Sequence, residues 1–442
     1  MSKVKSYPLY SDFNQEWLGE LPSHWKVMRT KFLFNLVTEP APIGNSEELL
    51  SVYTALGVKP RKEMEARGNK ASSTDNYWRV EQGDIIVNKL LAWMGAVGIS
   101  EYNGVTSPAY DILRAKENAN PYFYNYLFRN PIASREFKRH SRGIMDMRLR
   151  LYFTRFGDIK LPQPPIEEQG KIVDYLQYKL KKIDRFIRKK KQLIKLLNEQ
   201  KTAIINNAVT KGLDSNAKMK PSGVEWLGDI PEHWEVKRLK YLAKICNGSD
   251  CDKKETGKYP VYGSGGVFGR TNAFLYDKVS VLLGRKGTVD KPQFVEEPFW
   301  TVDTAFYTKI KESEIVPIFL YYLCCSIPFG FYSSKTALPS MTQTSLYQVK
   351  LTVPPKHEQN DILRFINDQV DVFQKTISTI EKEIALTQEY KIVIIAEAVT
   401  GKIDVRDFEI PETLVEECYE ELEEELNFAA EDEAEYKKQE ME

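Results

Sequence analysis

The decapeptide EWLGELPSHW, at residues 16–25, returns as EWLGDIPEHW at residues 225–234. The match continues beyond both stretches, through Leu33 in the first copy and Leu242 in the second. Self-similarity at a fixed separation, here 209 residues, is the signature of a repeated structural unit. The sequence therefore predicts a duplicated domain.

Later matches show where the two copies differ in length. PYFYNYL at residues 121–127 corresponds to PIFLYYL at 317–323, a separation of 196, and the separation is 190 from Lys160 and Lys350 onward. Only the middle of each copy changes length. Because loops tolerate insertions and often carry function, this pattern favours a binding protein with two different reading surfaces on one scaffold.

Length and cysteine usage agree with two ordinary domains in a reducing compartment. The chain of 442 residues is too long for a single ordinary core. Its five cysteines are scattered, and there is neither a basic-then-apolar leader nor an apolar run of membrane-spanning length. We expect a cytosolic, reduced protein without contact to a membrane.

The formal net charge of zero hides an uneven distribution. Residues 411–442 contain fourteen acidic residues and two lysines, a charge of −12, so residues 1–410 carry +12. A basic body with an acidic tail is typical of a protein whose partner is a polyanion.

Each copy ends in a long helical pattern, which begins at PPIEEQ (164–169) in the first and at PPKHEQ (354–359) in the second. The prolines end the preceding strand, and acidic residues are favourable at a helix N-terminus. Both patterns keep an apolar heptad, which predicts coiled-coil seams. The seam residues are Leu176, Leu180, Ile183, Ile187, Ile194, Leu197, Ile204 and Ala208, and Ile366, Val370, Phe373, Ile377, Ile380, Ile384, Ile394 and Ala398.

Three lysines interrupt these seams. Lys201 and Lys391 occupy the same nominal core position of the two copies, and Lys190 stands where Ile380 fills the second seam. Either the long side chains reach out to solvent, or they set the register against a partner. A lone helix would expose its apolar stripe, so we expect the two helices to pack on each other, antiparallel and with pseudo-two-fold symmetry.

Short apolar strands, glycine-rich turns and short helices precede each long helix, which predicts two mixed α/β globules of irregular topology and an α+β fold overall. Examples are the strands at 84–87 and 279–283 and the helices at 121–129 and 317–325. The predicted boundaries are a first globule at 1–163, a central helix with linker at 164–221, a second globule at 222–353, a distal helix at 354–405 and an acidic tail at 406–442.

This combination resembles the specificity subunit of type I restriction-modification systems, over about residues 10 to 405. The repeated motif, the duplication, the order of globule and helix, and the length of the helices all agree with this family. The resemblance implies that each globule is a target recognition domain, which reads half of a bipartite, asymmetric site in double-stranded DNA. It also implies that the helices set the spacing and dock the modification (methyltransferase) and restriction (translocase) subunits. The acidic tail is not part of the shared pattern.

Basic and amide side chains in predicted loops are the candidates for DNA contact, because Lys and Arg neutralise phosphates and Arg and Gln can bond to base edges. Each single residue is more readily explained as an ordinary solvated surface charge, and only the whole set points to DNA. The candidates are Lys59, Arg61, Lys62, Lys89, Trp93, Arg142, Arg148 and Arg150 in the first globule, and Lys253, Lys254, Ser264, Arg270, Arg285, Lys286, Lys291, Gln343 and Thr344 in the second. The candidates for partner contact are Leu176, Ile183, Lys190, Lys201, Ile366, Phe373 and Lys391.

The segment LGRKG, at 283–287, follows a predicted strand, and its glycines would let the backbone approach a phosphate. Asn88-Lys89 follows the comparable strand of the first copy. The glycine-rich stretch 262–270 lacks the Gly-Lys-Ser/Thr of a nucleotide loop, so it predicts a turn.

Catalytic and metal-binding patterns are missing from the sequence. His24 and His233 stand beside tryptophans, which favours packing over chemistry, and Cys246 and Cys251 lack the close partners of a zinc site. No Asn/Asp-Pro-Pro-aromatic motif and no helicase phosphate loop occurs. We expect a non-catalytic chain without metal or cofactor. The resemblance implies partner subunits that use S-adenosylmethionine, ATP and Mg²⁺.

Two other classes of function stay open at this point. A divergent globule could hide a nuclease or methyltransferase, which would turn over DNA without partners. Alternatively, the chain could be a coiled-coil protein–protein adaptor, which would show no preference for a DNA sequence.

Overall fold

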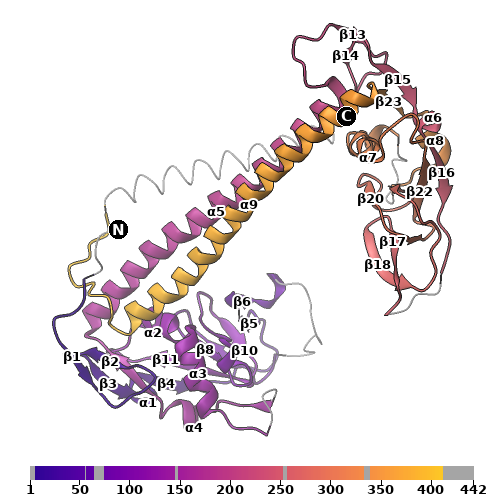
Figure 1. Cartoon of the computed structure of the whole chain (residues 1–442). Helices are drawn as coiled ribbons and strands as arrows, with labels where there is room; N and C mark the ends of the chain where they lie inside the picture. The colour runs from indigo at the N-terminus through magenta and orange to yellow at the C-terminus, as the bar shows by residue number, and fades with distance from the viewer. Residues whose placement is uncertain are drawn as a thin grey trace. The chain divides into compact units, whose positions relative to one another are not determined.

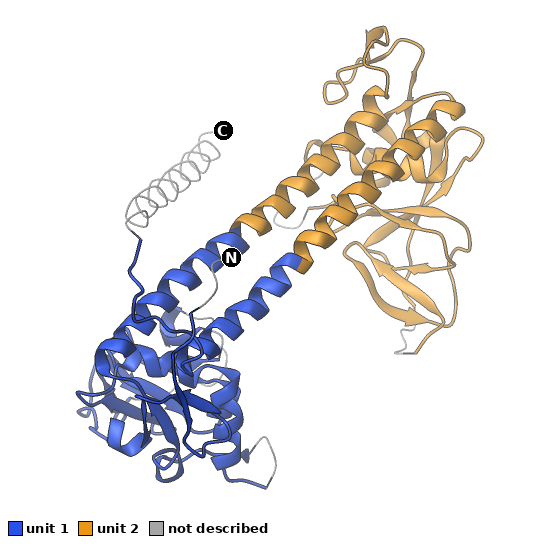
Figure 2. Ribbon diagram, turned by 60° about the vertical axis from the view of Figure 1, so that its left-hand side comes forward, with its two compact units in different colours: residues 1–188, 383–442 blue, residues 189–382 orange. Residues whose placement is uncertain are grey.

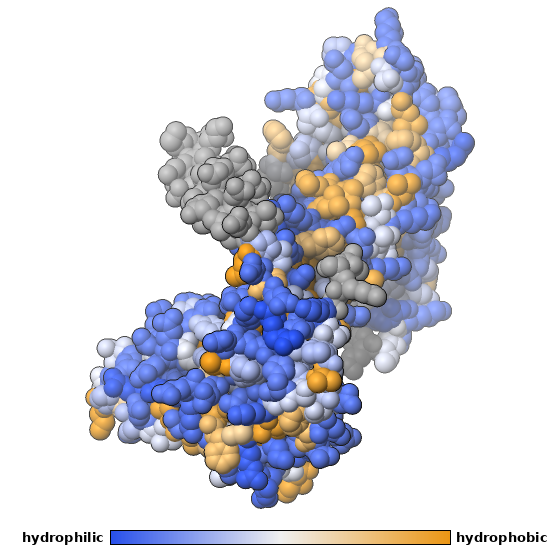
Figure 3. Space-filling view, turned by 90° about the vertical axis from the view of Figure 1, so that its left-hand side faces the viewer, coloured by the Kyte–Doolittle hydropathy of each residue, from blue (hydrophilic) through white to orange (hydrophobic). Residues whose placement is uncertain are grey.

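The computed structural model of the chain describes residues 5–54, 56–63, 74–144, 148–251, 256–332 and 339–411. The chain divides into two compact units, residues 1–188 with 383–442 and residues 189–382 (Figure 2). Each unit holds one globule together with one part of each of two long helices. Among the described residues, none of the helices combines the length and the apolar character needed to cross a membrane. Most of the face drawn in Figure 3 is hydrophilic, with smaller hydrophobic areas.

The two long helices are α5, Ile166–Lys211, and α9, Lys356–Val399 (Figure 1). In the first unit the start of α5 lies beside the end of α9, and Asp184 binds Lys391 through both carboxylate oxygens, at 2.6 and 2.9 Å. In the second unit Ala208, near the end of α5, shares a core with Ile366, near the start of α9. The helices are therefore antiparallel within each unit, as the heptads predict.

The first globule supplies the shorter elements up to α5. They are β1 (Tyr10–Asp12), β2 (Glu20–Pro22), β3 (Lys26–Arg29), α1 (Thr30–Leu33), β4 (Phe34–Val37), β5 (Leu50–Tyr53), β6 (Gly57–Pro60), η1 (Arg61–Glu63), β7 (Trp78–Val80), β8 (Ile85–Asn88), η2 (Ala92–Met94), β9 (Val97–Ile99), β10 (Gly104–Thr106), β11 (Tyr110–Ala115), α2 (Pro121–Phe128), α3 (Pro131–His140), α4 (Phe153–Phe156) and β12 (Lys160–Gln163).

The second globule lies between α5 and α9. Its elements are β13 (Met219–Pro221), β14 (Asp229–Pro231), β15 (Glu235–Arg238), α6 (Leu239–Leu242), β16 (Ala243–Asn247), β17 (Tyr259–Gly263), β18 (Gly266–Thr271), β19 (Ser280–Gly284), β20 (Gln293–Val295), β21 (Trp300–Thr301), β22 (Ala305–Ile310), α7 (Pro317–Cys325), η4 (Phe329–Phe331), α8 (Gln343–Gln348) and β23 (Lys350–Val353). Strand β13 falls in the segment that the sequence analysis assigns to a linker.

The sheets repeat between the globules. The four-stranded sheet has the order β4-β11-β8-β9 in the first and β16-β22-β19-β20 in the second, and the two-stranded ribbons β12-β3 and β15-β23 also correspond. The globules differ where the sequence changes length. The first contains the two-stranded sheets β5-β6 and β7-β10, and the second contains the three-stranded sheet β18-β17-β21. The duplication and its variable middle are confirmed.

The central strands β8 and β19 are buried along their whole length, because a sheet residue in the middle of a globule has neighbours on both faces. Aromatic residues of α2 fill the first core, where Phe123, Tyr124 and Phe128 are fully buried. Helix α2 starts at Pro121, and the side chain of Asn120 caps it by accepting from the backbone nitrogens of Tyr122 and Phe123.

The repeated decapeptide joins each globule to its long helix. Trp25 is 2% exposed, and its indole nitrogen donates to Glu168 in the first turn of α5 at 2.9 Å. His24 lies 2.8 Å from the same carboxylate, and the hydroxyl of Tyr7 donates to it. The packing role predicted for His24 is thus accompanied by a hydrogen bond.

The second copy repeats this joint. The indole nitrogen of Trp234 donates to Glu358 at 2.8 Å, and His233 lies 2.6 Å from that carboxylate. The following glutamines act alike: Gln169 accepts from the backbone of Asn120 at 2.8 Å, as Gln359 does from Val316. The Glu-Gln pair after each Pro-Pro therefore fastens the start of a long helix to two places on its globule.

The described end of the chain packs within the first unit. Arg406 binds Asp404 and lies 5.1 Å over the ring of Tyr7, while Phe408 contacts the rings of Tyr175 and Tyr178. Residues 406–411, which the sequence analysis places in the acidic tail, thus include contacts to the first globule and α5.

Candidate nucleic-acid interface

The turn after β8 holds the first candidate residue. Asn88 ends the strand, and its side chain accepts from the backbone nitrogens of Leu90 and Leu91 at 3.0 and 3.3 Å. The Lys89 ammonium donates to the carbonyl of Pro108 at 2.8 Å and lies 3.1 Å from Asp111. Burial raises the pKa of the Asp111 carboxyl, while Lys89 acts in the opposite sense. The turn is therefore well ordered, with part of the lysine charge already matched.

An arginine-rich loop lies directly against this turn. The backbone nitrogen of Leu151 donates to the carbonyl of Lys89 at 2.8 Å, and Arg142 and Arg150 exchange two backbone hydrogen bonds of 3.0 and 2.9 Å. Gly143 is required here, because a Cβ at this position would lie 2.4 Å from the carbonyl oxygen of Arg148. The loop exposes three arginines, Arg142, Arg148 and Arg150.

Trp93 lies in η2, next to the same turn, and it has a cationic neighbour that the sequence analysis missed. The Lys138 ammonium lies 4.9 Å from the centroid of the Trp93 ring, and the indole nitrogen donates to the carbonyl of Leu90 at 3.1 Å. Lys138 belongs to the basic last turn of α3, which ends in Lys138, Arg139 and His140. This run of basic residues is the sequence signal from which Lys138 could have been predicted as a candidate.

The remaining candidates of the first globule form a separate group on the β5–β6 hairpin. The Lys59 ammonium lies 5.7 Å from the ring centroid of Tyr102, and Lys62 pairs with Glu48. Arg61 begins η1, directly after the hairpin. Arg129 anchors the hairpin by donating to the carbonyl of Thr54 at 3.0 Å and to that of Val97 at 2.7 Å.

In the second globule the corresponding turn follows β19. A Cβ on Gly284 would lie 2.1 Å from the carbonyl oxygen of Thr288, and Gly287 has a φ of +80°, so both glycines are needed for this backbone path. Between them Arg285 donates to the carbonyl of Asp303 at 3.4 Å, and the Lys286 ammonium lies 3.9 Å from the Asp303 carboxylate. Lys286 is exposed.

The two turns are structurally equivalent. The backbone nitrogen of Met341 donates to the carbonyl of Arg285 at 2.9 Å, just as Leu151 donates to Lys89. Residues 151 and 341 are 190 apart, and residues 89 and 285 are 196 apart, which are the separations of the duplicated sequence. The same buttressed turn thus presents lysine in one globule and arginine in the other.

The other candidates of the second globule are divided between bonded and exposed positions. The guanidinium of Arg270 donates to the carbonyls of Gly257 and Lys258, both at 2.6 Å, and Gln343 donates to that of Ile245 at 3.2 Å. Lys291 and Thr344 are exposed. Ser264 lies in the turn between β17 and β18, where its nitrogen donates to Thr304 at 3.3 Å. The two remaining candidates, Lys253 and Lys254, lie outside the described residues.

The candidates for partner contact fall into two groups. Leu176, Ile183, Ile366 and Phe373 are at most 9% exposed, so their side chains are covered within the chain itself. Lys391 binds Asp184 across the seam. Lys190 and Lys201 are partly exposed. Contact of this seam with a partner subunit stays a prediction, and it would have to be made by the exposed residues that flank the seam.

Two further observations concern the cysteines and the possible metal ligands of the described residues. Cys246, Cys324 and Cys325 are free thiols, and burial raises the pKa of the Cys325 thiol to about 11. That part of the chain also holds no group of three His, Cys, Asp or Glu side chains arranged to bind a metal ion.

Comparisons with known proteins agree with this architecture. A family described as the type I restriction modification DNA specificity domain matches residues 22–196 and 231–388. The MjaVIII specificity subunit of a type I restriction enzyme from Methanocaldococcus jannaschii is 25% identical over an alignment of 430 positions, which covers 88% of this chain and 95% of that protein. The MjaIX specificity subunit from the same organism is 20% identical and covers 90% of this chain and 98% of its own length.

Among solved structures, one chain from a study of complex assembly and conformational transition in the type I R-M system superposes with a TM-score of 0.63. It is 14% identical, and the match covers 87% of this chain and 99% of that chain. At this level of sequence identity, the similarity shows a shared fold.

Proposed function

The chain belongs to the family of type I restriction-modification DNA specificity domains, and we propose that it is the subunit that reads the DNA sequence for such a system. Each globule would read one half of a bipartite, asymmetric site in duplex DNA. The different middle segments of the two globules support two different half-sites.

The observation that carries this proposal is the pair of equivalent turns. A buried strand, β8 or β19, ends in a turn whose carbonyl is held by the segment before α4 or α8, and the turn presents Lys89 or Arg285. A cation on a rigid, buttressed backbone suits DNA recognition, because the contact is made without ordering a flexible loop.

The chemistry of the side chains suggests a division of work. A guanidinium can bond to the two acceptors of guanine in the major groove, whereas an ammonium or an exposed arginine neutralises phosphate. We assign the base contacts of the second globule to the turn with Arg285, and the phosphate contacts of the first to the loop with Arg142, Arg148 and Arg150. Lys138 and Trp93 would flank that loop.

The proposed complex divides recognition from catalysis. The chain itself would be non-catalytic and cytoplasmic, and it would bind modification and restriction subunits that use S-adenosylmethionine, ATP and Mg²⁺. The antiparallel helices, fastened to each globule through Glu168 and Glu358, would carry the docking surface and fix the distance between the half-sites.

The test is methylation mapping of DNA from cells that express the chain with modification subunits of a related system. One split motif, modified on both strands, is the expected result, and purified chain should shift a duplex with that motif in preference to a scrambled one. Equal binding of both duplexes would favour a protein–protein adaptor. Turnover of DNA by the purified chain alone would favour an enzyme.

A further inference from the structure

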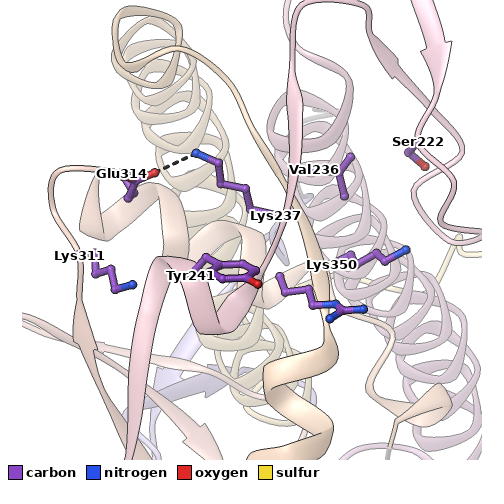
Figure 4. A pocket seen from close by; sticks show the side chains of 8 residues that line it. Ser222, Val236, Lys237, Tyr241, Lys311, Glu314 and Lys350 are labelled. Atoms are coloured by element: carbon purple, nitrogen blue, oxygen red, sulfur yellow. Dashed lines mark hydrogen bonds and ion pairs between the residues drawn. The ribbon is translucent and has the colours of Figure 1, made fainter.

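A cationic pocket of about 690 Å³ lies on the second unit (Figure 4). It is formed where the β15-β23 ribbon meets α6 and the end of β22. In Figure 4 the ring of Tyr241 lies between Lys311 and Lys350. The charged and aromatic residues that line the pocket are Lys237, Arg238, Tyr241, Lys311, Glu314 and Lys350.

Two cations of this pocket, Arg238 and Lys350, are not compensated by a carboxylate among the described residues. Arg238 stands directly opposite Lys350 in the antiparallel ribbon, an arrangement in which like charges destabilise the pair. The carboxylates of Glu314 and Glu235 lie 2.8 and 3.0 Å from the Lys237 ammonium. Within the described residues, no hydrogen bond or ion pair reaches the side chain of Arg238 or Lys350.

The first copy has the same ribbon, with a carboxylate beside one of its two cations. Arg29 stands opposite Lys160, but Asp158 lies 2.8 Å from Lys31 and 3.9 Å from Arg29. The residue that corresponds to Asp158 is Gln348, 190 positions later, which is neutral. The duplication therefore provides an internal comparison: one copy has its own carboxylate 3.9 Å from the arginine of the pair, and the other has a neutral residue at that position and leaves the pair open to an external anion.

We propose that this pocket binds a backbone phosphate of the DNA duplex, outside the base pairs that the second globule reads. Arg238 and Lys350 would hold the phosphate oxygens, and the exposed hydroxyl of Tyr241 would donate a further hydrogen bond. The proposal rests on the proposed function, since it assumes that the chain binds duplex DNA.

The sheet gives the position of this phosphate. Strand β22 begins at Ala305, which pairs with Gly284 at the turn that carries Arg285, here called the recognition turn of the second globule. It ends at Ile310, next to Lys311 of the pocket. Five residues at about 3.4 Å each separate the two ends by roughly 17 Å. Along a duplex that follows these strands, that distance corresponds to about five base pairs. A phosphate contact at such a distance would orient the globule without adding sequence information.

The test exchanges the charge pattern of the two copies in the full chain. Gln348→Asp should lower the affinity for a duplex with the target motif by about tenfold and reduce the slope of log K against log salt by about 1, with the motif unchanged. Arg238→Gln with Lys350→Gln should do the same. Asp158→Gln, which opens the equivalent pair in the first copy, is the matched variant, and it should raise affinity. All three change exposed or ribbon-edge residues, and thermal unfolding verifies that they fold.

A second measurement locates the contact. Replacing single phosphates of the duplex by neutral methylphosphonates should weaken binding of the unaltered chain at one position about five base pairs from the second half-site. The same replacement should have no further effect on the binding of the Gln348→Asp variant.

If the variants bind with unchanged affinity and salt slope while the unaltered chain selects its motif, the pocket does not hold DNA and the proposed function stands. Loss of partner assembly with normal DNA binding would likewise overturn the proposal in favour of a carboxylate-bearing protein. If the unaltered chain shows no selectivity for any duplex, the proposed function itself fails.

Discussion

The carboxylate of Glu168 accepts a hydrogen bond from the indole nitrogen of Trp25 at 2.9 Å, across 143 residues of sequence. It joins the first turn of α5 to the repeated decapeptide, at a side chain that is 6% exposed. The second joint, between Glu358 and Trp234, has the same geometry but a carboxylate that is 29% exposed. The two joints should therefore differ in strength.

We expect Glu168→Ala to lower the free energy of unfolding by about 2 kcal/mol, because it leaves the buried Trp25 nitrogen without an acceptor. Glu358→Ala should cost clearly less, since water can replace the lost carboxylate. Denaturant unfolding of both variants measures the difference, and Glu168→Gln, which keeps one acceptor, is the control. Equal losses for the two alanine variants would contradict the argument.

Asp184 and Lys391 should behave as a register pair of the helices in the first unit. The two side chains are 44% and 33% exposed, so their interaction should contribute about 0.5 to 1 kcal/mol. A double-mutant cycle with Asp184→Ala and Lys391→Ala measures this coupling directly. Lys201, the equivalent of Lys391, is the control position, and its replacement by Ala should show no coupling to Asp184.

Replacing Arg285 in the turn after β19 should alter one half of the target only. Arg285→Ala should relax discrimination at base pairs of the second half-site by about 1 to 3 kcal/mol per base pair, because a bidentate contact to a base edge is lost. Lys89→Ala is the matched variant: its ammonium suits a phosphate, so it should weaken binding and leave the sequence of both half-sites unchanged. Methylation mapping of each variant, assembled with partner subunits, reads the result. Changes in both half-sites from one substitution would show that the globules do not read independently.

The acidic end of the chain should suppress stray contacts with DNA. Deleting residues 412–442, which removes fourteen acidic residues and two lysines, should raise the affinity for random duplex and leave the target motif unchanged. The deletion spares Phe408 and Arg406, which pack in the first unit. Binding of random duplex at matched salt measures the effect. Unchanged affinity would mean that the acidic end has a different function.

Sequence patterns predicted the parts of this protein that repeat or follow a period. The decapeptide, the heptads and the strands at β8 and β19 needed only local or periodic signals, and the structure confirms them. The contacts of single side chains depend on which distant segments meet. Arg270 illustrates this, because its guanidinium bonds to carbonyls of Gly257 and Lys258 that reach it only through the pairing of β17 with β18. The roles of Glu168 and Gln169 could not be predicted either, because their partners are also distant in the sequence.

The long helices should act as a ruler between the half-sites. Helix α5 has 46 residues and α9 has 44, and neither contains an interruption, so one heptad corresponds to about 10 Å, or about three base pairs. Counted from the bonded pair Asp184 and Lys391 in opposite chain directions, residues 190–196 of α5 match residues 379–385 of α9. Deleting both segments keeps the seam in register and spares that pair.

The half-sites of such a variant should keep their sequences and lie about three base pairs closer together. The reason is that each globule remains fastened to its own helix start by Glu168 or Glu358, while the stretch of helix between the two fastenings is shorter by one heptad. Deleting residues 190–196 alone is the control, because it leaves the helices unequal and should impair folding. Methylation mapping of the assembled, active variant gives the spacing. An unchanged spacing would mean that the gap is determined inside the globules, by the position of the recognition turns.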